Sequence, residues 1–430
     1  MMEWSKFNLM FRGKNNQILL YNFASSSYLQ LDKSFANIIE KIKEKPNIDI
    51  SRSPELYFQL RAGGFLVENG ADKSLVQVLK MNRMASNYSS NQLNLTIALT
   101  KSCNFNCEYC YEQNRVSSGM SQETVAEVVR FIKKHKRLDR IHITWYGGEP
   151  LFEFDRLKQL SKKMQSLGLN YEAQIITNGY LLTEEVIPSL EELEISNIQI
   201  TIDGLEETHN KRRPLKCGGK TYGQIIRNID RLVCSKWNGQ LNIRVNVDKI
   251  NSNEFIQVYQ WMESRYPQEI ERQVRVYPGF VDDLSRRKNG NFFTYYDKGQ
   301  FLLDLLENYK INPMRILPHM EVDGCTMTKK NAYVIGPEGE LYKCWRDLGE
   351  EGEVIGNINS FTNWNMALVA EGMVGASYLE EKSCEKCMLF PVCDGGCPKK
   401  RMLNKRDNGK RDTCSYFKGH IEHFLKGYIM

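Results

Sequence analysis

Short apolar stretches alternate with amphipathic stretches along the chain from residue 93 to about residue 280. The apolar stretches are LNLTIAL, RIHITWY, EAQIITN, NIQITID, LNIRVNV and QVRVYP, and each has the length and the branched side chains of a strand. The segments between them are too long for hairpins, and SQETVAEVVRFIKKH repeats its apolar residues at helical spacing. Strands joined by helices pair in parallel, so the pattern predicts a βα barrel or an open parallel sheet.

Different patterns flank this region. Before residue 80, KFNLMFR, NQILLYNF and SYLQLD predict a small antiparallel meander, followed by helices over SFANIIEKIKEK and SPELYFQLRAGGFLV. The polar stretch at 81–92 predicts a linker. After about residue 310 the periodicity gives way to Cys, Gly and charged residues, which is typical of a domain held together by metal. We therefore expect a module at 1–80, a core at 93–310 and a third domain at 311–430.

The composition is that of an ordinary globular protein. The chain has 430 residues, of which 41% are hydrophobic, and a net charge of +6. Basic residues are spread along the chain apart from one run at 399–411, so we expect no nucleic-acid partner. No apolar stretch reaches the roughly 18 residues of a membrane span, and the N-terminus lacks the pattern of a signal peptide. We therefore expect no membrane partner and a cytoplasmic location.

The 12 cysteines fall mainly into two groups. In a reducing compartment, grouped cysteines indicate metal binding rather than disulfides. Cys217 lies in a predicted loop outside both groups, and Cys234 closes a helical pattern in which we expect it to be buried. The first group is Cys103, Cys107 and Cys110, and the second is Cys325, Cys344, Cys384, Cys387, Cys393, Cys397 and Cys414.

The first group follows the first predicted strand of the core. A structural zinc site needs a fourth ligand, and no Cys or His follows in this loop before the helix predicted at 121. An iron-sulfur cluster held by three thiolates instead leaves one iron open to another ligand. The spacing Cys103-x3-Cys107-x2-Cys110 resembles that of the radical S-adenosylmethionine (SAM) superfamily. The resemblance implies a [4Fe-4S] cluster on these cysteines, SAM on the open iron and a partial (β/α)6 TIM-type barrel.

Other residues near the predicted strand ends match motifs of the same family. Gly147-Gly148-Glu149-Pro150 resembles the family's GGEP motif, in which glycine backbone and a carboxylate receive the ammonium group of SAM. Glycines permit a close backbone approach, and Glu149 would supply the opposite charge. The resemblance also implies that Tyr109 lies near the adenine.

Two further strands end in polar residues. Thr177 and Asn178 correspond to the polar pair that lies near the ribose of SAM in this family. Residues 201–213, TIDGLEETHNKRR, are similar to a segment SIDG-x4-H-x2-R that is common in peptide-modifying members. The resemblance implies that Asp203, and Arg244 on the sixth strand, line the SAM site.

The second cysteine group resembles the complete seven-cysteine signature of the SPASM domain, which binds two auxiliary iron-sulfur clusters in peptide and protein maturases. The relatives that supply an eighth cysteine do so at the position of His319. Two alternatives stay open: His319 ligates the inner cluster, or that cluster keeps an open site for a substrate thiolate, which we favour. The implied ligands are Cys384, Cys387, Cys393 and Cys414 for the outer cluster, and Cys325, Cys344 and Cys397 for the inner one.

The N-terminal pattern ending in LRAGGFLV resembles the PqqD-like recognition element, a small winged-helix-like α+β module. Such a module binds a leader peptide by adding it as a strand to a sheet edge. Together the resemblances imply an oxygen-sensitive radical SAM/SPASM enzyme with three [4Fe-4S] clusters and SAM. Its partners would be a precursor peptide with a leader and a reductant such as flavodoxin or ferredoxin.

Several reactions fit this expectation. We favour a thioether crosslink between a Cys sulfur and a carbon, because the inner cluster lacks an eighth cysteine. The enzymatic alternatives are a carbon–carbon crosslink of the Lys–Trp type and the oxidation of a sulfatase Ser or Cys to formylglycine. Outside catalysis the alternative is a zinc-stabilised interaction protein, which does not account for the GGEP motif.

Overall fold

The computed structural model describes residues 1–13, 16–45, 53–110, 112, 119–270, 272–282, 284, 291–314, 324–360 and 364–429. His319, the candidate eighth ligand, lies outside the described residues. The chain divides into two units. The first unit comprises Met1–Tyr88, Thr294–Thr328 and Val374–Met430, and the second comprises Ser89–Phe293 and Lys329–Met373.

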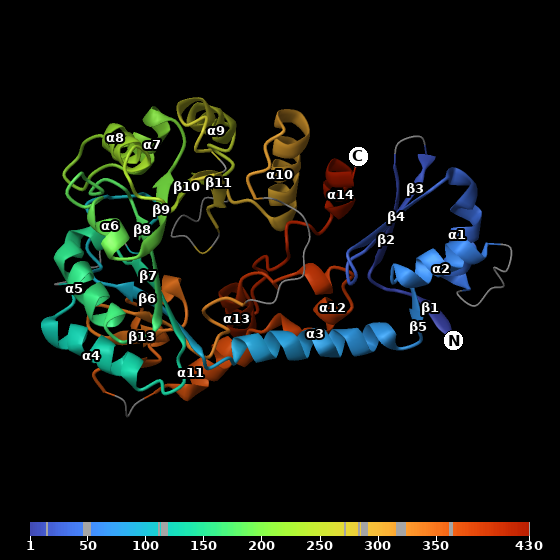
Figure 1. Cartoon of the computed structure of the whole chain (residues 1–430), viewed down its shortest axis with the longest axis horizontal. Helices are drawn as coiled ribbons and strands as arrows, with labels where there is room; N and C mark the ends of the chain where they lie inside the picture. Colours follow the sequence, from blue (N-terminus) through green and yellow to red (C-terminus); the bar gives the residue numbers. More distant parts are fainter. Residues whose placement is uncertain are drawn as a thin grey trace. The chain divides into compact units, whose positions relative to one another are not determined.

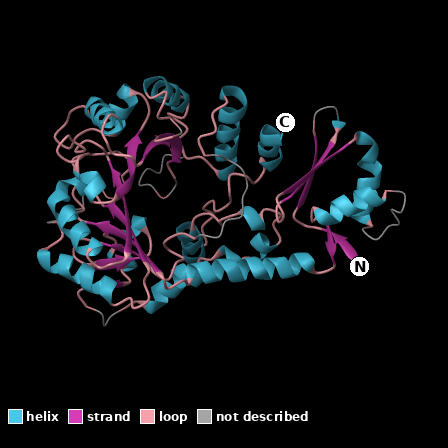
Figure 2. Ribbon diagram, in the orientation of Figure 1, coloured by secondary structure: helices cyan, strands magenta, loops and turns pink. Residues whose placement is uncertain are grey.

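A nine-stranded sheet forms the centre of the second unit (Figures 1 and 2). Its order is β11-β10-β9-β8-β7-β6-β12-β13-β14, and neighbours from β11 to β12 pair in parallel. The six strands from β6 to β11 confirm the predicted partial (β/α)6 barrel. The strands are β6 (Gln92–Ala98), β7 (Arg140–Tyr146), β8 (Asn170–Thr177), β9 (Ile195–Ile202), β10 (Gln240–Val247), β11 (Val274–Phe280), β12 (Ala332–Ile335), β13 (Glu340–Tyr342) and β14 (Gly356–Asn357).

The helices between these strands cover one face of the sheet (Figure 1). Side chains alternate along a strand, so Ile198 and Ile200 of β9 are fully buried while Gln199 and Thr201 line a cavity on the other face. The barrel therefore presents a polar face to its inside. The helices are α4 (Gln122–Lys133), α5 (Phe154–Gln165), α6 (Ser189–Glu192), α7 (Glu206–Arg212), α8 (Tyr222–Val233) and α9 (Glu254–Arg265), with α11 (Met366–Ala370) beyond β14.

The N-terminal part of the first unit contains the predicted antiparallel meander, formed by β2 (Asn8–Arg12), β3 (Ile18–Asn22) and β4 (Ser27–Leu31). Helices α1 (Ala36–Glu44) and α2 (Pro54–Ala62) supply apolar residues to the same core. The end of the second expected helix is instead a strand. The segment after the glycines forms β5 (Leu66–Glu68), which pairs with β1 (Met2–Trp4), because Gly64 adopts a φ of +75° that turns the chain out of the helix.

The linker expected at 81–92 is mostly helical. Helix α3 runs over Ala71–Asn87, and its buried face includes Val76, Leu79 and Arg83. The guanidinium of Arg83 donates to the carbonyls of Phe390 and Pro391, both at 3.0 Å. Because this partner lies some 300 residues further along the chain, the local pattern could not show it.

The C-terminal part is divided differently from the expected domain at 311–430. Lys329–Met373 belongs to the second unit because β12 pairs with β6, whereas Val374–Met430 belongs to the first.

Cys234 is exposed at the C-terminal cap of α8 and not buried as expected. None of the helices within the described ranges has the length and apolar character needed to cross a membrane. The helices here are α10 (Tyr295–Tyr309), α12 (Lys382–Glu385), α13 (Pro398–Asp407) and α14 (Ile421–Ile429).

Candidate active site

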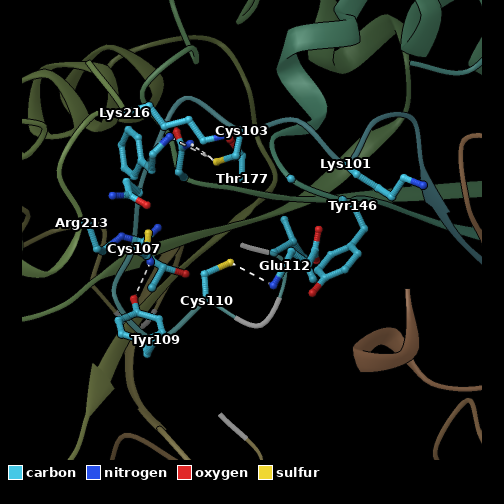
Figure 3. A pocket seen from close by; sticks show the side chains of 17 residues that line it. Lys101, Cys103, Cys107, Tyr109, Cys110, Glu112, Tyr146, Thr177, Arg213 and Lys216 are labelled. Carbon is cyan, nitrogen blue, oxygen red and sulfur yellow. Dashed lines mark hydrogen bonds between the residues drawn. The ribbon is translucent and has the colours of Figure 1, made fainter. Parts of the chain in front are cut away.

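The loops that follow β6, β7 and β8 border a solvent-open cavity of about 1010 Å³, which we call the cysteine-loop cavity. Cys103, Cys107 and Cys110 all line it, and Figure 3 shows their side chains. Five other predicted site residues line the same cavity: Tyr109, Gly147, Gly148, Thr177 and Asn178. The structure therefore brings most of the expected SAM site together at one end of the parallel strands, where such sheets carry their sites.

The chemistry of the three cysteines fits an iron-sulfur cluster, because thiolates are the usual ligands of such clusters and all three side chains line one cavity. Burial, followed by the nearby Glu149 carboxylate, raises the pKa of Cys103 to about 12, and burial raises that of Cys107 to about 11. Both thiols therefore stay protonated at neutral pH until iron displaces the protons.

The glycine pair after β7 allows two loops to pack closely. A Cβ at Gly147 would lie 2.3 Å from the carbonyl oxygen of Thr100, and one at Gly148 would lie 2.2 Å from that of Ser102. Gly147 also has a φ of +115°, which L side chains rarely adopt. Two backbone hydrogen bonds hold the two loops together. Gly148 N–H donates to the carbonyl of Thr100 at 3.1 Å, and Glu149 N–H donates to that of Ser102 at 2.9 Å. The glycines thus fix the loop that begins the cysteine motif.

We expect Gly148→Ala to lower the free energy of unfolding by about 1–3 kcal/mol, because the methyl group would push the Ser102 backbone away. The same displacement should lower the iron bound per chain after reconstitution. Denaturant unfolding and iron analysis measure the two effects. Gly352→Ala is the control, since no atom lies within 4 Å of its Cβ, and it should change the free energy of unfolding by less than about 1 kcal/mol. Equal effects of the two variants would contradict the packing role.

Glu149 has different contacts from those expected of a residue that receives the ammonium group. Its carboxylate is fully buried, outside the cavity lining, and accepts hydrogen bonds from Thr177 Oγ1 at 2.6 Å, Asn178 N–H at 2.8 Å and Leu151 N–H at 3.1 Å. Burial raises its pKa, although these donors act in the opposite direction. In this structure Glu149 joins the ends of β7 and β8, and Pro150 is buried beside it.

A buried polar network holds Tyr109 between the second and third cysteines. Its hydroxyl donates to Asp203 Oδ1 at 2.8 Å and accepts from Arg213 at 2.7 Å and Asn246 at 3.0 Å. Arg213 also lines the cavity, beside Tyr109 in Figure 3, and its Nε has no hydrogen-bond partner among the described residues. Sequence reasoning did not single out Arg213, although it ends the segment at 201–213. An unpaired buried donor at a cavity wall is suited to binding an anion.

Asp203 and Arg244 do not line the cysteine-loop cavity. Asp203 is fully buried behind its wall, where Arg212 Nε donates to it at 3.0 Å and Arg213 lies at 3.6 Å. Arg212 in turn donates to Asp248 at 2.9 Å. Arg244 lines a second cavity, which shares Tyr109 and Arg213 with the first. In the described geometry, neither Asp203 nor Arg244 therefore contacts the cysteine-loop cavity directly.

The predicted outer-cluster cysteines all lie in the first unit. Burial raises the pKa of Cys393 to about 11, with further contributions from the nearby thiols of Cys387 and Cys384. Lys418 Nζ lies 3.5 Å from the sulfur of Cys414. The nearby thiols of Cys414 and, to a smaller extent, Cys387 raise the pKa of Lys418. These contacts place the four thiols in one region. Of the inner set, Cys325 and Cys397 belong to the first unit and Cys344 to the second, and that set stays a prediction.

Sequence comparison identifies relatives of this chain. Residues 97–262 match the family model of the Radical SAM superfamily. A serine-type anaerobic sulfatase-maturating enzyme of Bacteroides thetaiotaomicron is 26% identical over 75% of this chain and 86% of its own length. A cysteine-type anaerobic sulfatase-maturating enzyme of Clostridium perfringens is 22% identical over 75% of this chain and 92% of its own.

Two solved structures share the fold. Native anSMEcpe with bound AdoMet has a TM-score of 0.59 at 21% identity and covers 78% of this chain and 97% of its own. SuiB of Streptococcus suis bound to its precursor peptide SuiA has a TM-score of 0.54 at 17% identity and covers 97% of this chain and 99% of its own. With the cysteine loop, the parallel barrel and the family match all in place, the protein is a radical SAM enzyme.

Proposed function

We propose that this enzyme modifies a ribosomally made precursor peptide and forms a thioether between a Cys sulfur and a carbon of another residue. Its relatives include sulfatase-maturating enzymes and a protein solved with its precursor peptide, so a peptide or protein substrate is the common feature. The likeness to SuiB extends over 97% of the chain, whereas that to anSMEcpe covers 78%. This difference supports a precursor peptide as the substrate, because the structure whose fold matches nearly the whole chain was solved with its precursor peptide.

When bound, the [4Fe-4S] cluster supplies the electron that cleaves SAM to methionine and a 5'-deoxyadenosyl radical. In the proposal Cys103, Cys107 and Cys110 hold this cluster, and Gly147 and Gly148 shape the neighbouring wall. Thr177 and Asn178 offer polar groups at the same cavity. The protein thus positions one C–H bond of the peptide and excludes water, which is its main contribution to the rate.

Thioether formation removes two hydrogen atoms from the peptide. One leaves the carbon as a hydrogen atom and gives 5'-deoxyadenosine, the other leaves sulfur as a proton, and one electron remains. We propose that the auxiliary clusters on the seven C-terminal cysteines accept this electron or hold the substrate sulfur. Oxidation of a sulfatase Ser or Cys to formylglycine is the second candidate, favoured by the identity of up to 26% to sulfatase-maturating enzymes.

The reconstituted full-length enzyme, tested anaerobically with SAM and a precursor peptide encoded beside its gene, should yield a product lighter by two hydrogen atoms. Mass spectrometry should also show one fewer thiol open to alkylation. Loss of two hydrogens with every thiol retained would identify a carbon–carbon crosslink instead. A sulfatase-derived peptide that gains a hydrazide-reactive aldehyde would support the second candidate and contradict the first.

A further inference from the structure

A second cavity of about 990 Å³ lies beside the cysteine-loop cavity, and we call it the arginine cavity. Its lining includes Arg213 together with Arg244 and Arg346 from β10 and the segment after β13. Five residues line both cavities: Tyr109, Tyr146, Ile176, Thr201 and Arg213. Three of them, Tyr109, Tyr146 and Arg213, are visible in Figure 3. A ligand in the arginine cavity therefore lies directly beside the proposed SAM site.

The three guanidinium groups of this cavity face one carboxylate among the described lining residues, that of Asp282. Asp282 accepts a hydrogen bond from Arg346 at 2.5 Å. The charge of Arg213 is balanced by the carboxylate of Asp203, which lies 3.6 Å away and is not part of the cavity lining. Arg244 makes no ion pair with a described carboxylate, and its Nε donates to the neutral amide oxygen of Asn246 at 2.9 Å. The described lining thus carries positive charge that its own carboxylates do not balance.

The fold makes room for Arg244 at one position of the neighbouring strand. A Cβ at Gly279 of β11 would lie 2.3 Å from Arg244 Nε and 2.8 Å from its Cζ, so the side chain lies across the bare glycine. Aromatic side chains form other walls of the cavity, and the rings of Tyr146 and Trp345 lie 5.2 Å apart. Apolar walls with a few charged groups are typical of a site that binds an organic ligand.

We propose that the arginine cavity binds the segment of the substrate peptide next to the reacting carbon, and that Arg244 and Arg346 recognise an Asp or Glu side chain in it. This inference rests on the proposed function. A guanidinium binds a carboxylate through two parallel hydrogen bonds, which a neutral amide or a lysine of the peptide cannot reproduce. A carboxylate would also balance the charge of Arg244. The carboxylate of SAM has the same chemistry, so the experiment must distinguish the two sources.

The test uses the anaerobic, reconstituted full-length enzyme with SAM and three blocked pentapeptides, Gly-Ala-Xaa-Ala-Gly, in which Xaa is Glu, Gln or Lys. We expect the Glu peptide to bind about tenfold more tightly than the Gln peptide by ligand-observed NMR, and the Lys peptide to bind most weakly. Arg244→Met and Arg346→Met should each reduce or abolish this preference. Arg244→Lys should restore part of it, because the charge returns without the planar fork.

Arg227→Met is the matched control, since Arg227 is exposed on α8 and lines neither cavity, and it should keep the full preference. Equal binding of the Glu and Gln peptides, or a preference that survives both arginine variants, would overturn the inference. A weaker affinity for SAM in Arg244→Met with the peptide preference unchanged would also overturn it and assign Arg244 to SAM. A wild-type enzyme that binds the Glu peptide selectively but cannot cleave SAM would refute the proposed function and leave the binding preference standing.

Discussion

The simultaneous replacement of Cys103, Cys107 and Cys110 by Ser should reduce 5'-deoxyadenosine formation to the level of a sample without protein. The three sulfurs line one cavity, and the proposal makes them the only protein ligands of the cluster that delivers the electron to SAM. The iron content of the reconstituted protein should fall by about four atoms per chain. Chromatography of the reaction products and iron analysis measure the two effects.

The control for this variant is Cys217→Ser combined with Cys234→Ser. Both of these cysteines are exposed and lie outside the two groups, so the double variant should keep its iron and its activity. If the triple variant still cleaved SAM, the cluster would have to be held elsewhere. Iron loss without loss of SAM cleavage would contradict the assignment in the same way.

The substitution Asp203→Asn should lower the free energy of unfolding by about 3–5 kcal/mol. Asp203 is fully buried and offsets two guanidinium groups, those of Arg212 and Arg213, which are themselves at least nine-tenths buried. Removing the negative charge takes the Asp203 carboxylate away from Arg213 and leaves Arg212 with its remaining ion pair to Asp248. The Tyr109 hydroxyl would also lose its charged acceptor, so the cysteine loop should become less ordered.

Denaturant unfolding of the apoprotein measures this effect without interference from bound iron. Asp155→Asn is the matched control, because the Asp155 side chain is 97% exposed and its pairing with Lys158 at 2.8 Å is screened by water. We expect no measurable change in stability for that variant. A loss of similar size in both would mean that the buried network around Asp203 contributes little.

Much of the site could be predicted because strand ends and cysteine spacing are local properties of the sequence. The apolar strands set the parallel order, and that order placed the loops carrying Cys103, Gly147 and Thr177 at one edge of the sheet. The position of Arg244 on its strand was equally readable. Its cavity was not, because the cavity also depends on Gly279 and Arg346, which come from other parts of the chain.

The features that the sequence did not reveal depend on long-range contacts. The motif match predicts that the Glu149 carboxylate contacts a ligand. In the structure this carboxylate accepts hydrogen bonds from Thr177 and Asn178, at the end of the next strand. Arg213 gains its position through Tyr109, more than a hundred residues earlier. Arg83, on the helix over 71–87, is buried because it donates to carbonyl acceptors near residue 390. In each case a polar side chain is buried by a partner that no local period can identify.

The pairing of β6 with β12 has a consequence for how the protein matures. β6 precedes the cysteine loop, and one of its two edges pairs with residues 332–335, which are synthesised much later. Until then that edge exposes unpaired N–H and C=O groups, and the long sequence separation makes its closure slow. Insertion of iron into the nascent chain would therefore precede completion of the sheet that supports the loop. Cluster assembly after residues 332–335 have been synthesised is the order that this topology favours.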